Sequence, residues 1–167
     1  RLSDSFPDAQ NVIRSMPNTP GQIGEGITGF VFLNSPNQSE HRLVTNILSS
    51  LGESFELKSE EDIDRITAIS GSGPAYLFEF TCALECAAKE IGLPEKLANK
   101  FALQTVTGAS KLLAVSGLHP EELRDQVTSP KGTTQAALES LEKNNLRKIV
   151  QDAVEAAKAR SIELSNA

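Results

Sequence analysis

Several residue types are scarce in this chain of 167 residues, which has no tryptophan, two cysteines and two histidines. Aromatic residues make up only 5%, so the chain lacks the stacking side chains with which proteins hold single-stranded nucleic acids. His41 and His119 are the only histidines, and neither has the spacing of a zinc site. We therefore expect no metal, and no mechanism built on a Cys–His nucleophile.

Long apolar runs and basic clusters are missing as well. Lys and Arg number 16 against 22 Asp and Glu, which gives a net charge of −6. We therefore expect neither nucleic acid nor a membrane as a partner. No signal peptide is visible, and the expected location is cytoplasmic; organellar targeting by a segment ahead of Arg1 remains an open alternative.

Apolar residues are concentrated in one predicted helix, residues 75–91. Cys82 and Cys86 lie four residues apart in it and share a face, which predicts buried free thiols, since a metal site would need two further ligands. This helix has no wide polar face and needs cover on several sides. A bundle of about a hundred residues has a limited interior, so the pattern indicates an oligomer.

Residue patterns predict a small α/β segment followed by helices only. The sequence Gly71-Ser72-Gly73-Pro74 is expected to interrupt or kink the helical path. The predicted strands are 11–16, 26–33 and 54–57, and the predicted helices are 36–50, 60–70, 75–91, 95–115, 120–125, 133–143 and 146–164.

The most informative stretch is the polar loop that contains Pro130 and Gly132 and runs directly into the helix at 133–143. Thr133 or Thr134 can cap this helix. Such a junction presents free backbone N–H groups and the positive end of a helix dipole, which suits a small carboxylate or phosphate. The local pattern alone favours the other interpretation, an ordinary capped helix start with no ligand.

Three blocks of the sequence together resemble the pyrroline-5-carboxylate reductases. The first is Arg14–Pro20 with Gly24-Glu25-Gly26, the second is Ser70–Tyr76, and the third is Ser129–Glu142. They occur in the family's order and at about its spacing, and the resemblance covers nearly the whole chain. It implies the reduction of 1-pyrroline-5-carboxylate to L-proline with NADPH or NADH, the last step of proline biosynthesis.

The resemblance also implies a mainly α fold, in which a helical dimerisation bundle follows a small α/β remnant of a Rossmann-type domain. We expect the remnant at 1–58 and the helical, substrate-binding domain at 59–167. The glycine-rich strand–turn–helix that holds dinucleotide phosphates has no counterpart here, and the chain begins at Arg1 rather than Met. We therefore expect a carboxyl-terminal part that is inactive alone, from an enzyme that forms homodimers or larger homo-oligomers.

By this resemblance, Ser129 and the backbone amides of Gly132, Thr133 and Thr134 bind the substrate carboxylate. The Thr134 hydroxyl is the catalytic candidate, because it would hydrogen-bond near the ring nitrogen. Other candidates are assigned to the cofactor: Met16, Pro17, Asn18 and Gln126.

Three positions keep an alternative open. Asn18 before Thr-Pro is also a common turn former, and Gln126 is equally a solvated residue at a helix end. Lys131 stands where the family commonly has glycine, so it can alter the loop path, add a cation near the carboxylate, or simply be solvated.

Two other functions stay open. One is a non-catalytic homologue that keeps the helical dimer as an assembly or regulatory module. The other is a related NAD-linked dehydrogenase that acts on a different small acid.

Overall fold

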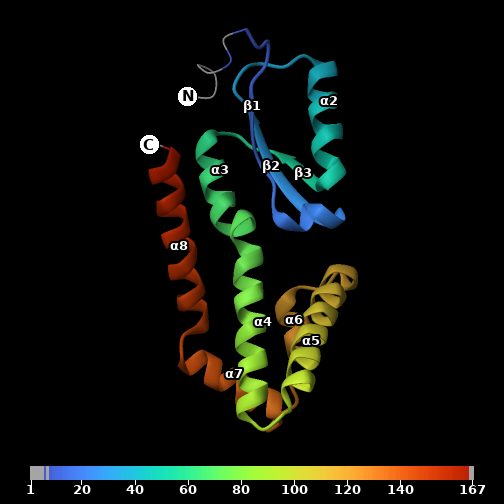
Figure 1. Ribbon diagram of the computed structural model, residues 1–167, viewed down its shortest axis with the longest axis vertical. Helices are drawn as coiled ribbons and strands as arrows, with labels where there is room; N and C mark the ends of the chain where they lie inside the picture. Colours follow the sequence, from blue (N-terminus) through green and yellow to red (C-terminus); the bar gives the residue numbers. More distant parts are fainter. Residues whose placement is uncertain (1–5, 7, 166–167) are drawn as a thin grey trace. The chain divides into compact units, whose positions relative to one another are not determined.

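The computed structural model describes residue 6 and residues 8–165, which form two compact units. The first unit contains the chain up to Tyr76 together with the segment from Asp152 onward, and the second contains Leu77–Gln151. Two helices, α4 (Gly73–Glu90) and α8 (Leu146–Ser165), continue from one unit into the other (Figure 1).

The first unit contains a three-stranded sheet of order β1-β2-β3 (Figure 1). Strand β1 pairs antiparallel with β2, and β2 pairs parallel with β3, with helix α2 between β2 and β3 in the chain. The prediction of three strands and an intervening helix is confirmed to within two residues. The bounds are Ile13–Met16 for β1, Gly26–Phe32 for β2, Gln38–Leu48 for α2 and Gly52–Glu56 for β3.

The core of the first unit lies on both faces of β2: helix α3 (Glu60–Ile66) packs on the face of Gly29, and Phe30 lies on the opposite face with Phe32, whose ring stacks on His41 of α2. Phe30 of β2 is 1% exposed and Ile63 of α3 is 2% exposed. Gly29 permits this close packing, because a Cβ there would collide with the δ-carbon of Ile66. Burial of these apolar side chains, at roughly 1.5–3 kcal/mol each, is the main stabilisation of this unit.

The predicted interruption before α4 is present, but it begins earlier than expected. The backbone widens into a π-helical turn over Thr67–Gly71, in which the Ser72 N–H donates to the Thr67 carbonyl at 2.8 Å. Helix α4 then starts at Gly73. Single π turns inside helices often mark functional positions, and this one overlaps the start of the second sequence block at Ser70 and Gly71.

The second unit is helical throughout, as the sequence predicts. Gly92 and Gly117 have φ angles of 97° and 67°, and this left-handed conformation, which glycine adopts readily, ends α4 and α5. The remaining helices lie within two residues of their predicted positions: α5 is Glu95–Ser116, α6 is Pro120–Gln126 and α7 is Thr133–Lys143. The predicted fold class, mainly α with a small preceding α/β part, is confirmed.

Helix α4 buries none of its residues within one chain, although most of them are apolar. Phe78 and Phe80 are 62% and 48% exposed. The prediction that Cys82 and Cys86 are buried is wrong for the single chain, where both residues are exposed, because none of the described elements covers them. In the described part of the chain, no helix combines the length and apolarity needed to cross a membrane.

A polar cluster around Asp64 ties the end of α8 to the sheet. One carboxylate oxygen of Asp64 accepts hydrogen bonds from Ser161 at 2.8 Å and Ser165 at 3.1 Å, and from Arg14 at 3.4 Å. Arg14 also donates to Ser165 at 3.0 Å. Asp64 is 8% exposed, so its charge depends on these donors rather than on water.

We predict that Asp64→Asn lowers the free energy of unfolding by about 2 kcal/mol, the scale of hydrogen bonds to a charged group. The amide keeps the shape of the side chain but removes the charge that Arg14 faces. Urea denaturation measures the change. Glu53→Gln on exposed β3 is the matched control and should have little effect; an equal loss in both variants would contradict the role of the cluster.

Candidate functional site

The loop after β1 carries the first group of candidate residues. Asn18 lies just ahead of a short 3-10 helix, Thr19–Ile23, and its side-chain oxygen accepts a hydrogen bond from the Ile27 N–H at 2.9 Å. The turn-forming role of Asn18 is therefore present. Because the oxygen is engaged, the side-chain NH2 group is the part of Asn18 that remains available to a ligand.

Two of the sequence blocks meet in the first unit. A Cβ placed on Gly71 would lie 2.6 Å from the terminal methyl of Met16, so the absence of a side chain at Gly71 makes room for Met16. The close approach at Gly71 is thus to a residue of β1 and not to a second helix. Met16 and Asn18 frame Pro17, which is exposed.

The loop of the third block lies in the second unit and contains a tight turn. The Gly132 N–H donates to the Ser129 carbonyl at 3.0 Å, which closes a four-residue turn with Pro130 and Lys131 at its centre. Lys131 has a φ of 61°. Proline at the second position and a positive φ at the third are the features of a type II turn, in which glycine or asparagine usually occupies the third position.

Helix α7 begins directly after this turn, and its opening amides are open. The expectation that Thr133 or Thr134 caps the helix is wrong: Gly132 occupies the N-cap and has no side chain to offer. Across the described residues, no acceptor is bonded to the N–H groups of Thr133, Thr134 and Gln135, and the first helical bond runs from Ala136 to the Gly132 carbonyl. These amides and the helix dipole favour an anion at this point.

Some polar groups of the loop are used in hydrogen bonds within the chain, and others remain available to a ligand. The Thr128 hydroxyl donates to the Arg124 carbonyl at 2.6 Å and so terminates α6. The Ser129 side chain is directed at Gly132, where any Cβ would collide with its hydroxyl oxygen. Gly132 is thus required as a small residue, and its own N–H is used within the turn.

Gln126 and Thr134 differ in exposure. Gln126 is the last residue of α6 and is exposed, whereas Thr134 in the first turn of α7 is half-buried. Sequence patterns did not single out Gln135, whose side-chain oxygen accepts a hydrogen bond from the Lys131 N–H at 2.7 Å. A glutamine four residues after the third position of a Pro-containing turn was the available signal.

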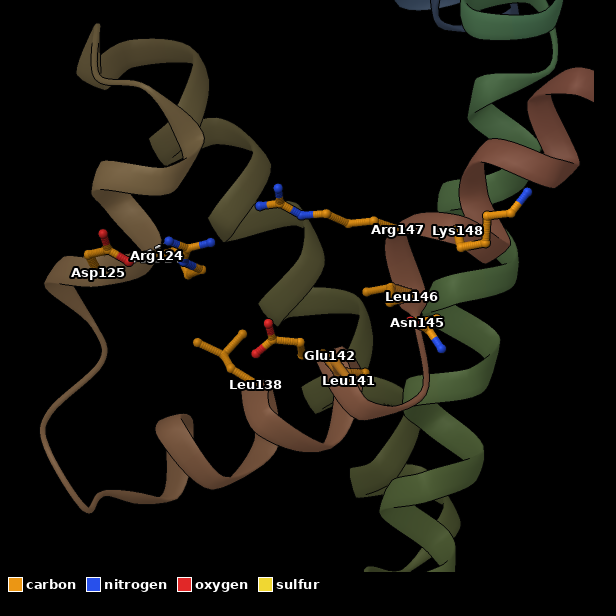
Figure 2. A pocket seen from close by; sticks show the side chains of 9 residues that line it. All are labelled: Arg124, Asp125, Leu138, Leu141, Glu142, Asn145, Leu146, Arg147 and Lys148. Carbon is orange, nitrogen blue, oxygen red and sulfur yellow. Dashed lines mark hydrogen bonds and ion pairs between the residues drawn. The ribbon is translucent and has the colours of Figure 1, made fainter.

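A hollow of about 820 Å³ in the second unit is lined by none of the predicted site residues. Figure 2 shows side chains from α6, α7 and the start of α8 around it. They include leucines and charged residues: Arg124, Asp125, Leu138, Leu141, Glu142, Asn145, Leu146, Arg147 and Lys148.

The charges in and beside this hollow are largely paired with one another. Arg147 donates to Glu121 at 2.7 Å, and this hydrogen bond is the main reason that the pKa of Glu121 is lowered. Arg124 donates to Asp125 at 2.9 and 2.7 Å, which raises the pKa of the Arg124 guanidinium. Since these cations already have carboxylate partners, the hollow is a poorer anion site than the start of α7.

The candidate residues therefore fall into two groups. Met16, Pro17 and Asn18 lie together in the first unit, and Gln126 and the turn before α7 lie in the second. The first group offers an amide and an apolar side chain. The second offers hydroxyls and three open amides, which is the chemistry that holds a small carboxylate.

Comparison with known proteins gives consistent results. Residues 60–164 match the family model described as pyrroline-5-carboxylate reductase dimerisation. A pyrroline-5-carboxylate reductase of Pseudomonas aeruginosa is 39% identical over 92% of this chain and 56% of its own length. That of Synechocystis is 40% identical over 98% of this chain and 61% of its own length.

Solved structures agree. The chain resembles a pyrroline-5-carboxylate reductase of Coxiella burnetii with a TM-score of 0.89 and 36% identity, over 97% of this chain and 60% of that one. It also resembles the Plasmodium falciparum pyrroline carboxylate reductase with NADP bound, with a TM-score of 0.85 and 36% identity, over 96% and 64%. The chain thus spans a little over half of the length of these relatives, and it belongs to the pyrroline-5-carboxylate reductase family.

Proposed function

We propose that the complete protein reduces 1-pyrroline-5-carboxylate to L-proline with a hydride from NADPH or NADH, and that it works as a homodimer or larger homo-oligomer. Membership of the family supports the reaction. The observation that carries the proposal within this chain is the start of α7, where three opening amides lack acceptors behind a turn that presents a serine hydroxyl.

The substrate carboxylate is assigned to the amides of Thr133 and Thr134, together with the Ser129 hydroxyl. Gly132 contributes by leaving room for that hydroxyl rather than by donating its own N–H, which the turn uses. Holding the carboxylate fixes the ring position, which is the main task in a reaction whose chemistry a cofactor supplies.

Thr134 is assigned the proton side of the reaction. Its hydroxyl hydrogen-bonds near the ring nitrogen and orients this nitrogen for proton uptake. Once the nitrogen is protonated, the imine carbon accepts a hydride more readily. The half-buried position of Thr134, beside two open amides, is compatible with both contacts. Neither carboxylates nor histidines are needed for this step.

NADPH or NADH supplies the hydride, and four residues are assigned to it: Met16, Pro17, Asn18 and Gln126. The fit rests on two observations in the first unit. Asn18 has an NH2 group to donate, and Met16 is held in place by contact with Gly71, where any side chain would displace it.

The division of the chain is also part of the proposal. Residues 1–58 are assigned to a nucleotide-binding domain, and 59–167 to the dimerisation and substrate-binding domain. Exposed apolar side chains on α2 and β3 support the first assignment, since Leu43, Ile47 and Phe55 are 60%, 59% and 51% exposed and need cover from further structure.

We predict that Thr134→Ala in the full-length protein lowers kcat/KM for 1-pyrroline-5-carboxylate by about 10- to 100-fold, the effect of one hydrogen bond to a charged group. Steady-state assays with NADPH measure it. The control is Thr45→Ala in α2, the same exchange at a helical threonine whose hydroxyl donates to the His41 carbonyl. An unchanged kcat/KM for Thr134→Ala would reject this role.

We predict that these 167 residues alone show no saturable binding at micromolar NADPH concentrations, because they contain no glycine-rich turn for the dinucleotide phosphates. Fluorescence titration against the full-length protein provides the comparison. Tight binding by the 167 residues would contradict the expectation that the cofactor needs a glycine-rich turn for its phosphates. A full-length protein that binds no NADPH and has no reductase activity would instead favour a non-catalytic assembly module.

A further inference from the structure

We propose that Gln135 is a positioning residue for the substrate carboxylate, acting through the turn at Lys131. This inference rests on the proposed function and adds a determinant of substrate affinity to it. The contact that motivates it is the 2.7 Å hydrogen bond from the Lys131 N–H to the Gln135 side-chain oxygen.

The turn needs such a contact because of the residue at its third position. With a φ of 61°, Lys131 adopts a left-handed backbone that disfavours any residue with a Cβ. Type I and type II turns differ in the orientation of the central peptide, and only the type II form has a positive φ at this position. A type I turn would suit lysine better, so an added interaction must favour the observed form.

Gln135 provides that interaction. The turn itself uses the Gly132 N–H, so the Lys131 N–H has no partner within the turn and is left to bond an acceptor from elsewhere. The Gln135 oxygen fills this need, and it can do so only while the central peptide keeps its present orientation. Gln135 is in turn fixed by donating to Glu139 at 2.7 Å, one turn further along α7.

The link to the substrate follows from what the turn orients. The peptide that carries the Lys131 N–H joins Pro130 to Lys131, and the next residue, Gly132, leads into the amides of Thr133 and Thr134. The same turn sets the Ser129 hydroxyl against Gly132. Without the hydrogen bond from Lys131 to Gln135, the turn would exchange between the type I and type II forms, so fixing the Ser129 hydroxyl and the amides on one carboxylate would cost additional conformational entropy.

The expected effect falls on binding rather than on chemistry. The carboxylate is bound equally in the ground state and in the transition state, so loss of this contact raises KM and leaves kcat almost unchanged. For one hydrogen bond that holds a turn, we expect KM to rise about three- to tenfold.

The test uses the full-length protein with 1-pyrroline-5-carboxylate and NADPH. Gln135→Met removes the acceptor and keeps the length of the side chain, and Gln135→Ala removes it with a residue that favours helix. We expect KM to rise about three- to tenfold in both variants with kcat within about twofold of the original. Gln38→Met, the same exchange at an exposed position of α2, is the matched control.

The double variant Q135E/E139Q separates positioning from general stability. The two exchanges reverse the hydrogen bond between residues 135 and 139. The side chain at 135 still accepts from the Lys131 N–H, and the side chain at 139 now donates to the side chain at 135. We expect it to restore KM to within about twofold. Hydrogen exchange of the Lys131 amide should quicken in Gln135→Met and return to its original rate in the swap.

Several outcomes would overturn the proposal. One is a KM that stays unchanged in both Gln135→Met and Gln135→Ala. Another is a Q135E/E139Q variant whose KM stays raised although hydrogen exchange at the Lys131 amide has returned to its original rate. A fall in kcat that follows a lowered Tm would indicate a merely structural role. If the unmodified protein has no reductase activity, the proposed function itself fails, and the role of Gln135 fails with it.

Discussion

The dominant constraint on this chain is apolar helix surface that one copy cannot cover. Helix α4 has no buried residue, and its phenylalanines and both thiols face solvent in the single chain. Leaving so much apolar area in water is unfavourable, so the second unit requires another surface. The match of residues 60–164 to a dimerisation model is consistent with a second copy as that surface.

The first unit is stabilised differently. It has a conventional interior on the two faces of β2, where Phe30 on the α2 side and Ile63 of α3 are almost fully buried. The end of α8 joins it through polar contacts to Asp64, whose carboxylate depends on Arg14 and two serines. Helix α8 therefore depends on a nearly buried charge for its attachment, and such a charge enforces one arrangement because it tolerates no loss of partners.

The start of α7 combines an unfavourable lysine conformation with an uncapped helix end. Lysine in a left-handed turn is unfavourable, yet the turn keeps the opening amides of the helix clear of any side-chain cap. A threonine or serine at the position of Gly132 could cap one of those amides, but its Cβ would displace the Ser129 hydroxyl. Glycine leaves them open, and the Gln135 side chain accepts a hydrogen bond from the turn instead, an arrangement compatible with the proposed anion site.

The sequence alone determined the order and bounds of the helices and strands, because periodicity and Gly/Pro signals act within a few residues. It also predicted an anion site at the loop that begins at Ser129. The exposure of Cys82, the contact of Met16 with Gly71 and the hydrogen bond from Lys131 to Gln135 were decided only by the tertiary structure. Each depends on which surfaces meet or on the direction of one peptide group, and such geometry is set by packing rather than by local residue preference.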